Sequence, residues 1–298
     1  MHERFKERLA GVNAIPATPF REDGEIDEAA FAHGIRFLVD SGLTAIYPCG
    51  NTGEFYSLDE SEATRVVDLA VEAAGGRALV IAGVGHDERT AARLARHAER
   101  AGADGLMIHQ PSHPFQREDG LLDYWRRIAD AAALPIVLYV RSEHVSAETL
   151  RRAADVPNIV AVKYAVNHLP SFAWAVKEIG VRLAWICGTA ETWAPFFYAA
   201  GAVGFTSGLA NVDPGRALAM AEALRERRFE DAMRIWGEVR PFEQLREKYA
   251  NGNNVSVVKE AMAQLGRSNG AVRPPIAPLS AEEKAQVTRM LRDWQLLP

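Results

Sequence analysis

The stretch Ala101-Gly-Ala-Asp-Gly105 has the form of a helix that ends at a glycine, followed closely by the start of a strand. Two other stretches share this form, Ser41-Gly-Leu-Thr-Ala45 and Ala200-Gly-Ala-Val-Gly204. Glycine just past a helix end accepts the left-handed conformation that closes the helix. The recurrence therefore indicates one strand–helix unit that is used many times, and such units build a parallel sheet with right-handed crossovers.

Short apolar runs rich in β-branched residues alternate with longer amphipathic stretches such as Glu60–Ala74, Glu88–Ala101 and Leu121–Ala133. The runs show almost no alternation of apolar and polar residues, as expected for strands buried on both faces. There are eight of them, and eight strand–helix units close into a barrel. The predicted strands are Val12–Thr18, Ala45–Cys49, Ala78–Val84, Gly105–His109, Pro135–Val140, Ile159–Tyr164, Arg182–Cys187 and Ala202–Ser207.

The pattern changes after the eighth predicted strand, where three long helical stretches follow one another. They are Pro214–Tyr249, Val255–Leu265 and Ala281–Leu297, with Pro274–Pro278 as a linker. The predicted fold class is therefore α/β: a (β/α)8 TIM barrel over residues 1–212, with residues 213–298 as a C-terminal helical extension of the same unit. The length of 298 residues suits such a barrel folded as one unit.

Composition excludes several classes of function. The chain is 48% hydrophobic and 24% charged, which is typical of a globular protein with a sizeable core. A net charge of -5 provides no basic field for nucleic acid or an acidic membrane surface. No apolar run is long enough to span a bilayer, and the charged N-terminus lacks the apolar core of a signal peptide. Only Cys49 and Cys187 are present, so we expect reduced thiols in a cytoplasmic protein.

In a barrel of this kind the active site forms at the C-terminal ends of the strands. The segments found at predicted strand ends are Gly50–Glu54, Tyr139–Arg141, Lys163-Tyr164, Gly188–Glu191 and Thr206–Asn211.

Lys163 is unusual because it lies near the end of Asn158–Tyr164, an otherwise apolar stretch. One interpretation is a lysine that reaches from a strand end into solvent, the commonest position of lysine. The other is a buried amine whose pKa is lowered from its free value of about 10.4. A neutral amine attacks a ketone and forms an imine, and the protonated imine then accepts electrons from the neighbouring carbon.

Two further features belong with this lysine. Tyr139 lies on the neighbouring predicted strand, where it is either a core residue with a satisfied hydroxyl or a phenol that passes protons. Gly50 and Gly53 bracket Asn51 and Thr52; such glycines allow successive backbone N–H groups to point inward and a ligand carboxylate to approach closely. A simple tight turn also fits the glycine spacing.

Together these residues resemble the dihydrodipicolinate synthase/N-acetylneuraminate lyase family over nearly the whole chain. The matching stretches are Gly50–Glu54, Leu138-Tyr139, Val162-Lys163 and Gly204–Val212. The resemblance implies a (β/α)8 barrel and a Schiff base between Lys163 and pyruvate or another 2-oxo acid. The reaction that the resemblance implies needs no cofactor beyond that imine and no metal.

The resemblance also implies roles for individual residues. Tyr139 and Thr52 would relay protons, and the backbone amides of Asn51 and Thr52 would hold the substrate carboxylate. Gly188 and Ser207 would line the same pocket. A homodimer or homotetramer is implied, with a small-molecule 2-oxo acid as the partner and neither nucleic acid nor membrane.

Two departures from the dihydrodipicolinate synthases concern the second substrate. Tyr139 is followed by Val-Arg141 where those enzymes have a proline-containing segment before an arginine, and His113 stands where they place a tyrosine that enters the neighbouring subunit. Gly53-Glu-Phe-Tyr-Ser-Leu58 and Arg141 look more like the 5-dehydro-4-deoxyglucarate dehydratase branch. That branch removes water and carbon dioxide from a sugar diacid through the same imine. Arg141 would bind a distal carboxylate or hydroxyl, because a guanidinium fork matches a carboxylate.

Three hypotheses about function remain open. The first is the Schiff-base lyase, in which Glu54 is structural and caps the backbone amides of the following turn. The second is a metal-dependent aldolase or hydrolase that uses loop histidines, although their spacing matches no tight ligand motif. The third is a 2-oxo acid binding protein without turnover. The histidines concerned are His86, His109, His113, His144 and His168.

Overall fold

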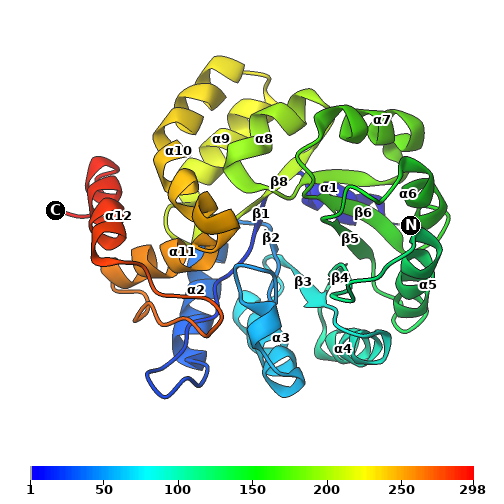
Figure 1. The fold of residues 1–298 in the computed structure, drawn as a ribbon, viewed down its shortest axis with the longest axis horizontal. Helices are drawn as coiled ribbons and strands as arrows, with labels where there is room; N and C mark the ends of the chain where they lie inside the picture. The colour runs from blue at the N-terminus through cyan, green and yellow to red at the C-terminus, as the bar shows by residue number, and fades with distance from the viewer. Residues whose placement is uncertain (1) are drawn as a thin grey trace.

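The computed structural model describes residues 2–298, and its centre is a closed barrel of eight parallel strands in chain order. Figure 1 looks into this barrel, with helices arranged around it. The prediction of a (β/α)8 TIM barrel with C-terminal helices is therefore confirmed. The strands are β1 Gly11–Ala14, β2 Ala45–Ile46, β3 Leu79–Val84, β4 Gly105–Ile108, β5 Ile136–Val140, β6 Ile159–Tyr164, β7 Ala184–Cys187 and β8 Gly204–Ser207.

Helices follow the strands and cover the outside of the barrel (Figure 1). They are α1 Glu3–Arg8, α2 Glu28–Asp40, α3 Glu60–Ala74, α4 Glu88–Ala101, α5 Glu118–Ala129, α6 Ala147–Ala153, α7 Leu169–Ile179, α8 Ala190–Ala199, α9 Pro214–Arg225, α10 Phe229–Asn251, α11 Asn254–Gln264 and α12 Ala281–Asp293, with short 3-10 turns at Phe55–Ser57, Gly180–Arg182 and Leu209–Asn211.

Local sequence signals fix several helix ends as predicted. Asp59 and Asp87 cap the N-termini of α3 and α4 with their side chains, so both helices begin where the sequence indicated. Gly42, Gly102 and Gly201 all have positive φ angles, of 97°, 87° and 108°. The recurring helix-closing glycine is therefore confirmed at each of the three junctions.

Two predicted strands end several residues earlier than expected, at Ala14 instead of Thr18 and at Ile46 instead of Cys49. Pro16 and Pro48 follow them within two residues, and proline has no N–H to donate to a neighbouring strand. The predicted helical stretch Pro214–Tyr249 is divided into two helices, α9 and α10, and between them Arg227 adopts a left-handed conformation with φ of 59°.

The barrel side chains form two separate layers, because alternate residues of a strand point to opposite faces. Val137, Tyr139 and Ala161 belong to the interior cluster, whereas Leu138 and Tyr164 belong to the cluster between barrel and helices. Lys163 has the same alternation as Ala161 and therefore points into the barrel.

Helix α1, which the sequence did not indicate, covers the N-terminal end of this interior. Its Phe5 contributes to the interior cluster and packs so closely on Gly105 that a Cβ there would lie 2.7 Å from the phenyl ring. Helix α1 thus closes the interior at the N-terminal ends of the strands, and Lys163 lies near their C-terminal ends.

The C-terminal helices pack directly on the barrel. Helix α9 contacts β8 and β1, α10 contacts α8 and α9, and α11 contacts α10 and α12. In Figure 1, α12 lies outermost, at the edge of the molecule. The division at residues 212 and 213 remains a prediction, since no break in packing marks it. Within residues 2–298, no helix has both the length and the apolar character needed to cross a membrane.

Candidate active site

Lys163 and Tyr139 meet at the upper end of the barrel interior. They are register partners on β6 and β5, and both side chains are buried. The Lys163 Nζ atom lies 3.9 Å from the centroid of the Tyr139 ring. The structure thus brings together the two residues that the sequence singled out, and it excludes the alternative of a lysine that extends into solvent.

Burial lowers the pKa of the Lys163 amine to about 7, and the positive charge of Arg141 acts in the same direction. An amine in water has a pKa of about 10.4 and is almost wholly charged at neutral pH. In this site a large fraction of the amine is neutral at that pH and holds the lone pair needed to attack a carbonyl carbon.

Tyr139 is held from its other side by the glycine-bracketed loop. Its hydroxyl oxygen accepts a hydrogen bond from Asn51 Nδ2 at 3.2 Å. Burial raises the pKa of Tyr139 to about 12, so the phenol keeps its proton at neutral pH. A protonated phenol beside a neutral amine is suited to give a proton and take it back.

The structure shows why the loop at 50–54 contains two glycines. A Cβ at Gly50 would lie 2.6 Å from Cγ2 of Ile15, and one at Gly53 would lie 2.9 Å from the carbonyl oxygen of Pro16. Neither glycine has a positive φ; the glycines are required by the close approach of this loop to the segment after β1. Thr52 is buried between them.

Gly188, the residue after β7, lies against the stem of the lysine. A Cβ there would lie 3.1 Å from Cγ of Lys163 and 2.9 Å from Cβ of Ala165. The absence of a side chain at this position therefore leaves room for the extended lysine.

Ser207 is buried at the end of β8, but its hydroxyl is engaged away from the barrel interior. It donates a hydrogen bond to the buried Glu191 carboxyl and accepts one from the backbone N–H of Ala210. Its alternation is that of Phe205, which belongs to the outer cluster. Burial raises the pKa of Glu191, and the nearby Glu243 carboxyl adds to the shift.

The preceding residue, Thr206, has the alternation that faces the interior, and the sequence analysis did not select it. Thr206 is buried, and its Oγ1 lies 3.4 Å from the carbonyl oxygen of Cys187. Side chains alternate between the two faces of a strand. Phe205 is a large apolar residue that points outward, so this alternation could have shown that Thr206 points inward and Ser207 outward.

Arg141 and His113 are exposed on the loops above the barrel. The guanidinium carbon of Arg141 lies 5.8 Å from the Tyr139 ring centroid, and its backbone N–H donates to Gln110 Oε1. His113 bonds locally with Phe115 and with none of the other predicted site residues. The structure therefore places Arg141 at the mouth of the site, whereas His113 makes no contact with the other predicted site residues of its own chain.

An aromatic stack that the sequence analysis did not predict lies beside Tyr139. The Phe55 ring stacks between His86 and His109, with centroid separations of 4.6 and 4.2 Å. His109 Nε2 lies 2.8 Å from the Cys49 carbonyl oxygen, and the ring packs edge-on to Tyr139. Burial lowers the pKa of His109 to about 3, so this histidine is neutral. The sequence signal for a histidine in this position was His109 itself, a polar residue directly after the apolar strand Gly105–Ile108.

The histidines considered as metal ligands lie in separate environments. His168 caps the start of α7 through Ser171, and His144 is exposed. Over residues 2–298 no three His, Cys, Asp or Glu side chains gather as a metal site would require. Cys49 and Cys187 are free and buried, as expected.

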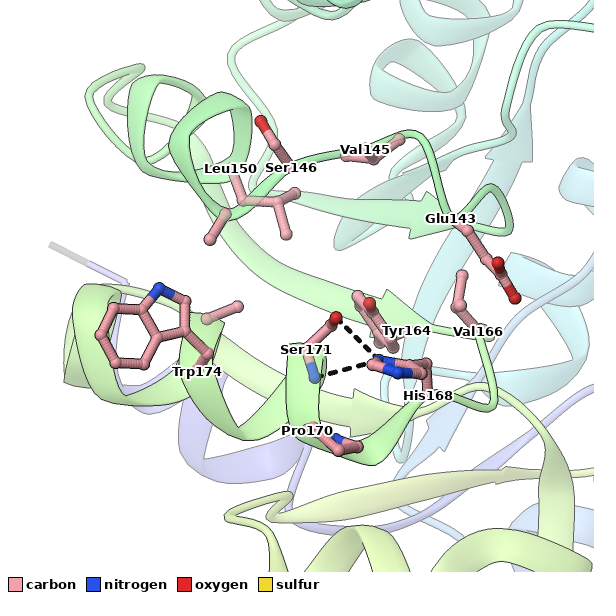
Figure 2. A pocket seen from close by; sticks show the side chains of 12 residues that line it. Glu143, Val145, Ser146, Leu150, Tyr164, Val166, His168, Pro170, Ser171 and Trp174 are labelled. Atoms are coloured by element: carbon pink, nitrogen blue, oxygen red, sulfur yellow. Dashed lines mark hydrogen bonds between the residues drawn. The ribbon is translucent and has the colours of Figure 1, made fainter.

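A cavity of about 460 Å³ lies on the other side of β6, between α6 and α7. Figure 2 shows Tyr164, His168 and Trp174 around it, with His168 bonded to Ser171. None of the residues predicted to bind or activate the 2-oxo acid lines it. Because Tyr164 and Lys163 are adjacent on one strand, this cavity and the lysine lie on opposite faces of the barrel wall.

One structural prediction is wrong. Glu54 does not cap the following 3-10 turn, which has no side-chain cap. Its buried carboxylate instead forms an ion pair with Lys259 of α11.

Comparisons with known proteins agree on one family. The model of the dihydrodipicolinate synthetase family matches residues 8–294. A probable 5-dehydro-4-deoxyglucarate dehydratase of Methylobacterium radiotolerans is 34% identical over 95% of each chain. The 4-hydroxy-tetrahydrodipicolinate synthase of Acidiphilium cryptum is 36% identical over 94% of this chain and 96% of its own. A crystal structure of dihydrodipicolinate synthase from Bacillus clausii superposes with a TM-score of 0.95 at 46% identity, covering 98% of this chain and 99% of that one.

Proposed function

The chain belongs to the dihydrodipicolinate synthetase family, and from this premise we propose that it is a lyase that activates a 2-oxo acid as an imine on Lys163. The observation that carries the proposal is the buried contact between the Lys163 amine, whose pKa is lowered to about 7, and the Tyr139 phenol. No cofactor is needed, because the imine itself supplies the electron sink.

The first step joins the amine nitrogen to the keto carbon of the substrate. Lys163 attacks that carbon, the keto oxygen takes up two protons and leaves as water, and a protonated C=N bond remains. Tyr139 is positioned to supply a proton to the departing oxygen, because its phenol lies against the amine and keeps its proton at neutral pH. Thr52, buried in the adjacent loop, is proposed to pass that proton onward.

The substrate carboxylate is proposed to bind the backbone N–H groups of Asn51 and Thr52. Successive amides at a strand end make a concave anion site, and Gly50 and Gly53 hold this loop close to the barrel. Asn51 also donates to the Tyr139 hydroxyl, so one loop would position both the substrate and the acid. Gly188 completes the pocket behind the lysine.

The second step we propose is dehydration of a sugar diacid, with 5-dehydro-4-deoxyglucarate as the best candidate. Loss of a proton next to the imine carbon gives an enamine, whose electrons expel the hydroxyl of the next carbon as water; loss of carbon dioxide follows. Arg141 places a positive charge at the mouth of the site, suited to the distal carboxylate of a diacid. Relatives named for this activity in Methylobacterium radiotolerans and Saccharopolyspora erythraea support this choice.

The alternative is condensation of the pyruvate enamine with an aldehyde, the reaction of a 4-hydroxy-tetrahydrodipicolinate synthase. The 36% identical protein of Acidiphilium cryptum and the 46% identical structure from Bacillus clausii favour it.

Measurement of turnover distinguishes the dehydratase from the synthase. The purified protein is incubated with 5-dehydro-4-deoxyglucarate, and separately with pyruvate and aspartate semialdehyde. Release of carbon dioxide from the diacid supports the dehydratase; consumption of the aldehyde with no such release supports the synthase. Imine formation without turnover of either would indicate a binding protein.

We also propose that the protein works in the cytoplasm as a homodimer or homotetramer. Both cysteines are free thiols, which suits a reducing compartment. Several large apolar side chains are exposed, among them Phe115, which is 86% exposed, and Trp174. Such side chains are commonly covered by a second subunit. Sedimentation of the purified protein measures the assembly directly.

A further inference from the structure

The loop proposed to bind the substrate carboxylate adopts a conformation that its own residues do not favour. Cys49 and Glu54, at its two ends, have φ angles of 59° and 57°, in the left-handed region that side chains other than glycine rarely adopt. Such a conformation persists only where surrounding contacts hold it. The contacts of the Glu54 side chain come from the C-terminal extension.

Both carboxylate oxygens of Glu54 are held by residues more than 200 positions later in the chain. Oε1 forms an ion pair with the Lys259 amine, and Oε2 accepts a hydrogen bond from the backbone N–H of Arg273 at 3.2 Å. Glu54 and Lys259 are both almost fully buried. The amine also donates to the carbonyl oxygen of Ala271 at 2.8 Å and lies 4.0 Å from the Phe20 ring centroid.

A second set of contacts holds the segment that follows Glu54. The Arg273 guanidinium donates to the carbonyl oxygens of Ser57 and Gly24 and pairs with the Glu62 carboxylate. The turn after the loop is therefore held to the extension at several points. Arg273 contacts Glu54 only through its backbone N–H, whereas Lys259 contacts it with a charged side chain from helix α11.

We propose that Lys259 is a positioning residue of the active site: its ion pair with Glu54 holds the loop so that the Asn51 and Thr52 amides face the substrate carboxylate. A buried carboxylate cannot remain charged without its partner, so the pair fixes where Glu54 lies. Glu54 directly follows Gly53, and the loop it ends also carries Asn51, which bonds to Tyr139. This inference rests on the proposed function of the loop.

The proposal makes a prediction about the kind of substrate that is affected. If Lys259 positions the carboxylate-binding amides, its loss weakens reaction with carbonyl compounds that carry a carboxylate. Reaction with a ketone that lacks one should lose much less, because it needs the loop only for the Asn51–Tyr139 hydrogen bond and not for the carboxylate-binding amides. A general loss of folding would reduce both reactions equally.

The test compares trapping of the Lys163 imine by borohydride with pyruvate and with hydroxyacetone, which has no carboxylate. Reduction of the C=N bond by hydride leaves a stable secondary amine, and peptide mass spectrometry quantifies the adduct. The variants are Lys259→Met and the double variant Glu54→Gln/Lys259→Met, which leaves no unpaired buried charge if the single variant fails to fold. The control is Lys284→Met, which removes an exposed ion pair with Glu260 in the same extension.

For the variants, we expect the pyruvate concentration that gives half-maximal trapping to rise at least tenfold more than the hydroxyacetone concentration does. Neither concentration should change in Lys284→Met. Equal losses with both compounds, or none with either, would overturn the proposal while leaving the proposed function intact. Absence of any Lys163 adduct in the wild-type protein would overturn both.

Discussion

The lowered pKa of Lys163 predicts a specific dependence of imine formation on pH. Only the neutral amine attacks a carbonyl carbon, so the rate follows the neutral fraction of Lys163. Burial lowers the pKa of Lys163 to about 7, with the Arg141 charge adding to the shift. The rate should therefore rise with pH at acidic values and become constant above neutrality.

The size of the effect follows from that pKa. With a value near 7, the neutral fraction is about 9% at pH 6, 50% at pH 7 and 91% at pH 8, so the rate increases about tenfold over this interval. An exposed lysine with a pKa of about 10.4 would show an increase of about 100-fold over the same interval and would continue to rise.

The assay mixes the protein with pyruvate at each pH and then transfers it to borohydride at one fixed pH, so that only imine formation depends on the first condition. Arg141→Gln should move the midpoint to higher pH, because it removes a positive charge that disfavours the charged amine. Arg127→Gln, at an exposed position on α5, is the matched control. A rate that keeps rising tenfold per unit through pH 9 would refute a buried amine.

Three further substitutions test the site. Lys163→Met should abolish turnover yet stabilise the fold by about 5 kcal/mol below pH 7, where the wild type holds a buried charge. Between pH 7 and 10 the unfolded chain binds more protons than the folded one, so this difference shrinks as pH rises, and calorimetry across pH measures it. An unchanged melting temperature would contradict the burial cost. Tyr139→Phe should lower kcat by about 10²- to 10⁴-fold while pyruvate still forms a slow adduct, and near-normal kcat would remove Tyr139 from proton transfer. Gly188→Ala should lower both kcat and stability, because the new methyl group would lie 2.9 Å from Cβ of Ala165 and 3.1 Å from the Lys163 stem; a normal kcat would show that the lysine has room to move.

The sequence predicted the barrel because its signals are local. Strand β6 and helices α3 and α4 were predicted at their observed bounds. An apolar run marks the strand and a capping aspartate marks the start of each helix, and both signals lie within a few neighbouring residues. The lysine and tyrosine were found because a polar residue at the end of an apolar strand is conspicuous. Their contact then follows from the parallel register of β5 and β6.

The misses involve orientation and long-range contact. Tyr47 is a second buried tyrosine of the barrel interior, and only the structure shows that its hydroxyl donates to Asn13 and does not contact the lysine. Glu54 was expected to act within its own turn, and its partner Lys259 lies in a distant helix. Spacing along the chain holds no information about such a pairing.

The central claim is that Lys163 forms the imine, and peptide mass mapping after borohydride reduction in the presence of a 2-oxo acid tests it most directly. The account predicts one reduced adduct, located on Lys163, with pyruvate and with 5-dehydro-4-deoxyglucarate. An adduct on any other lysine, or turnover of either acid with Lys163 unmodified, would contradict it.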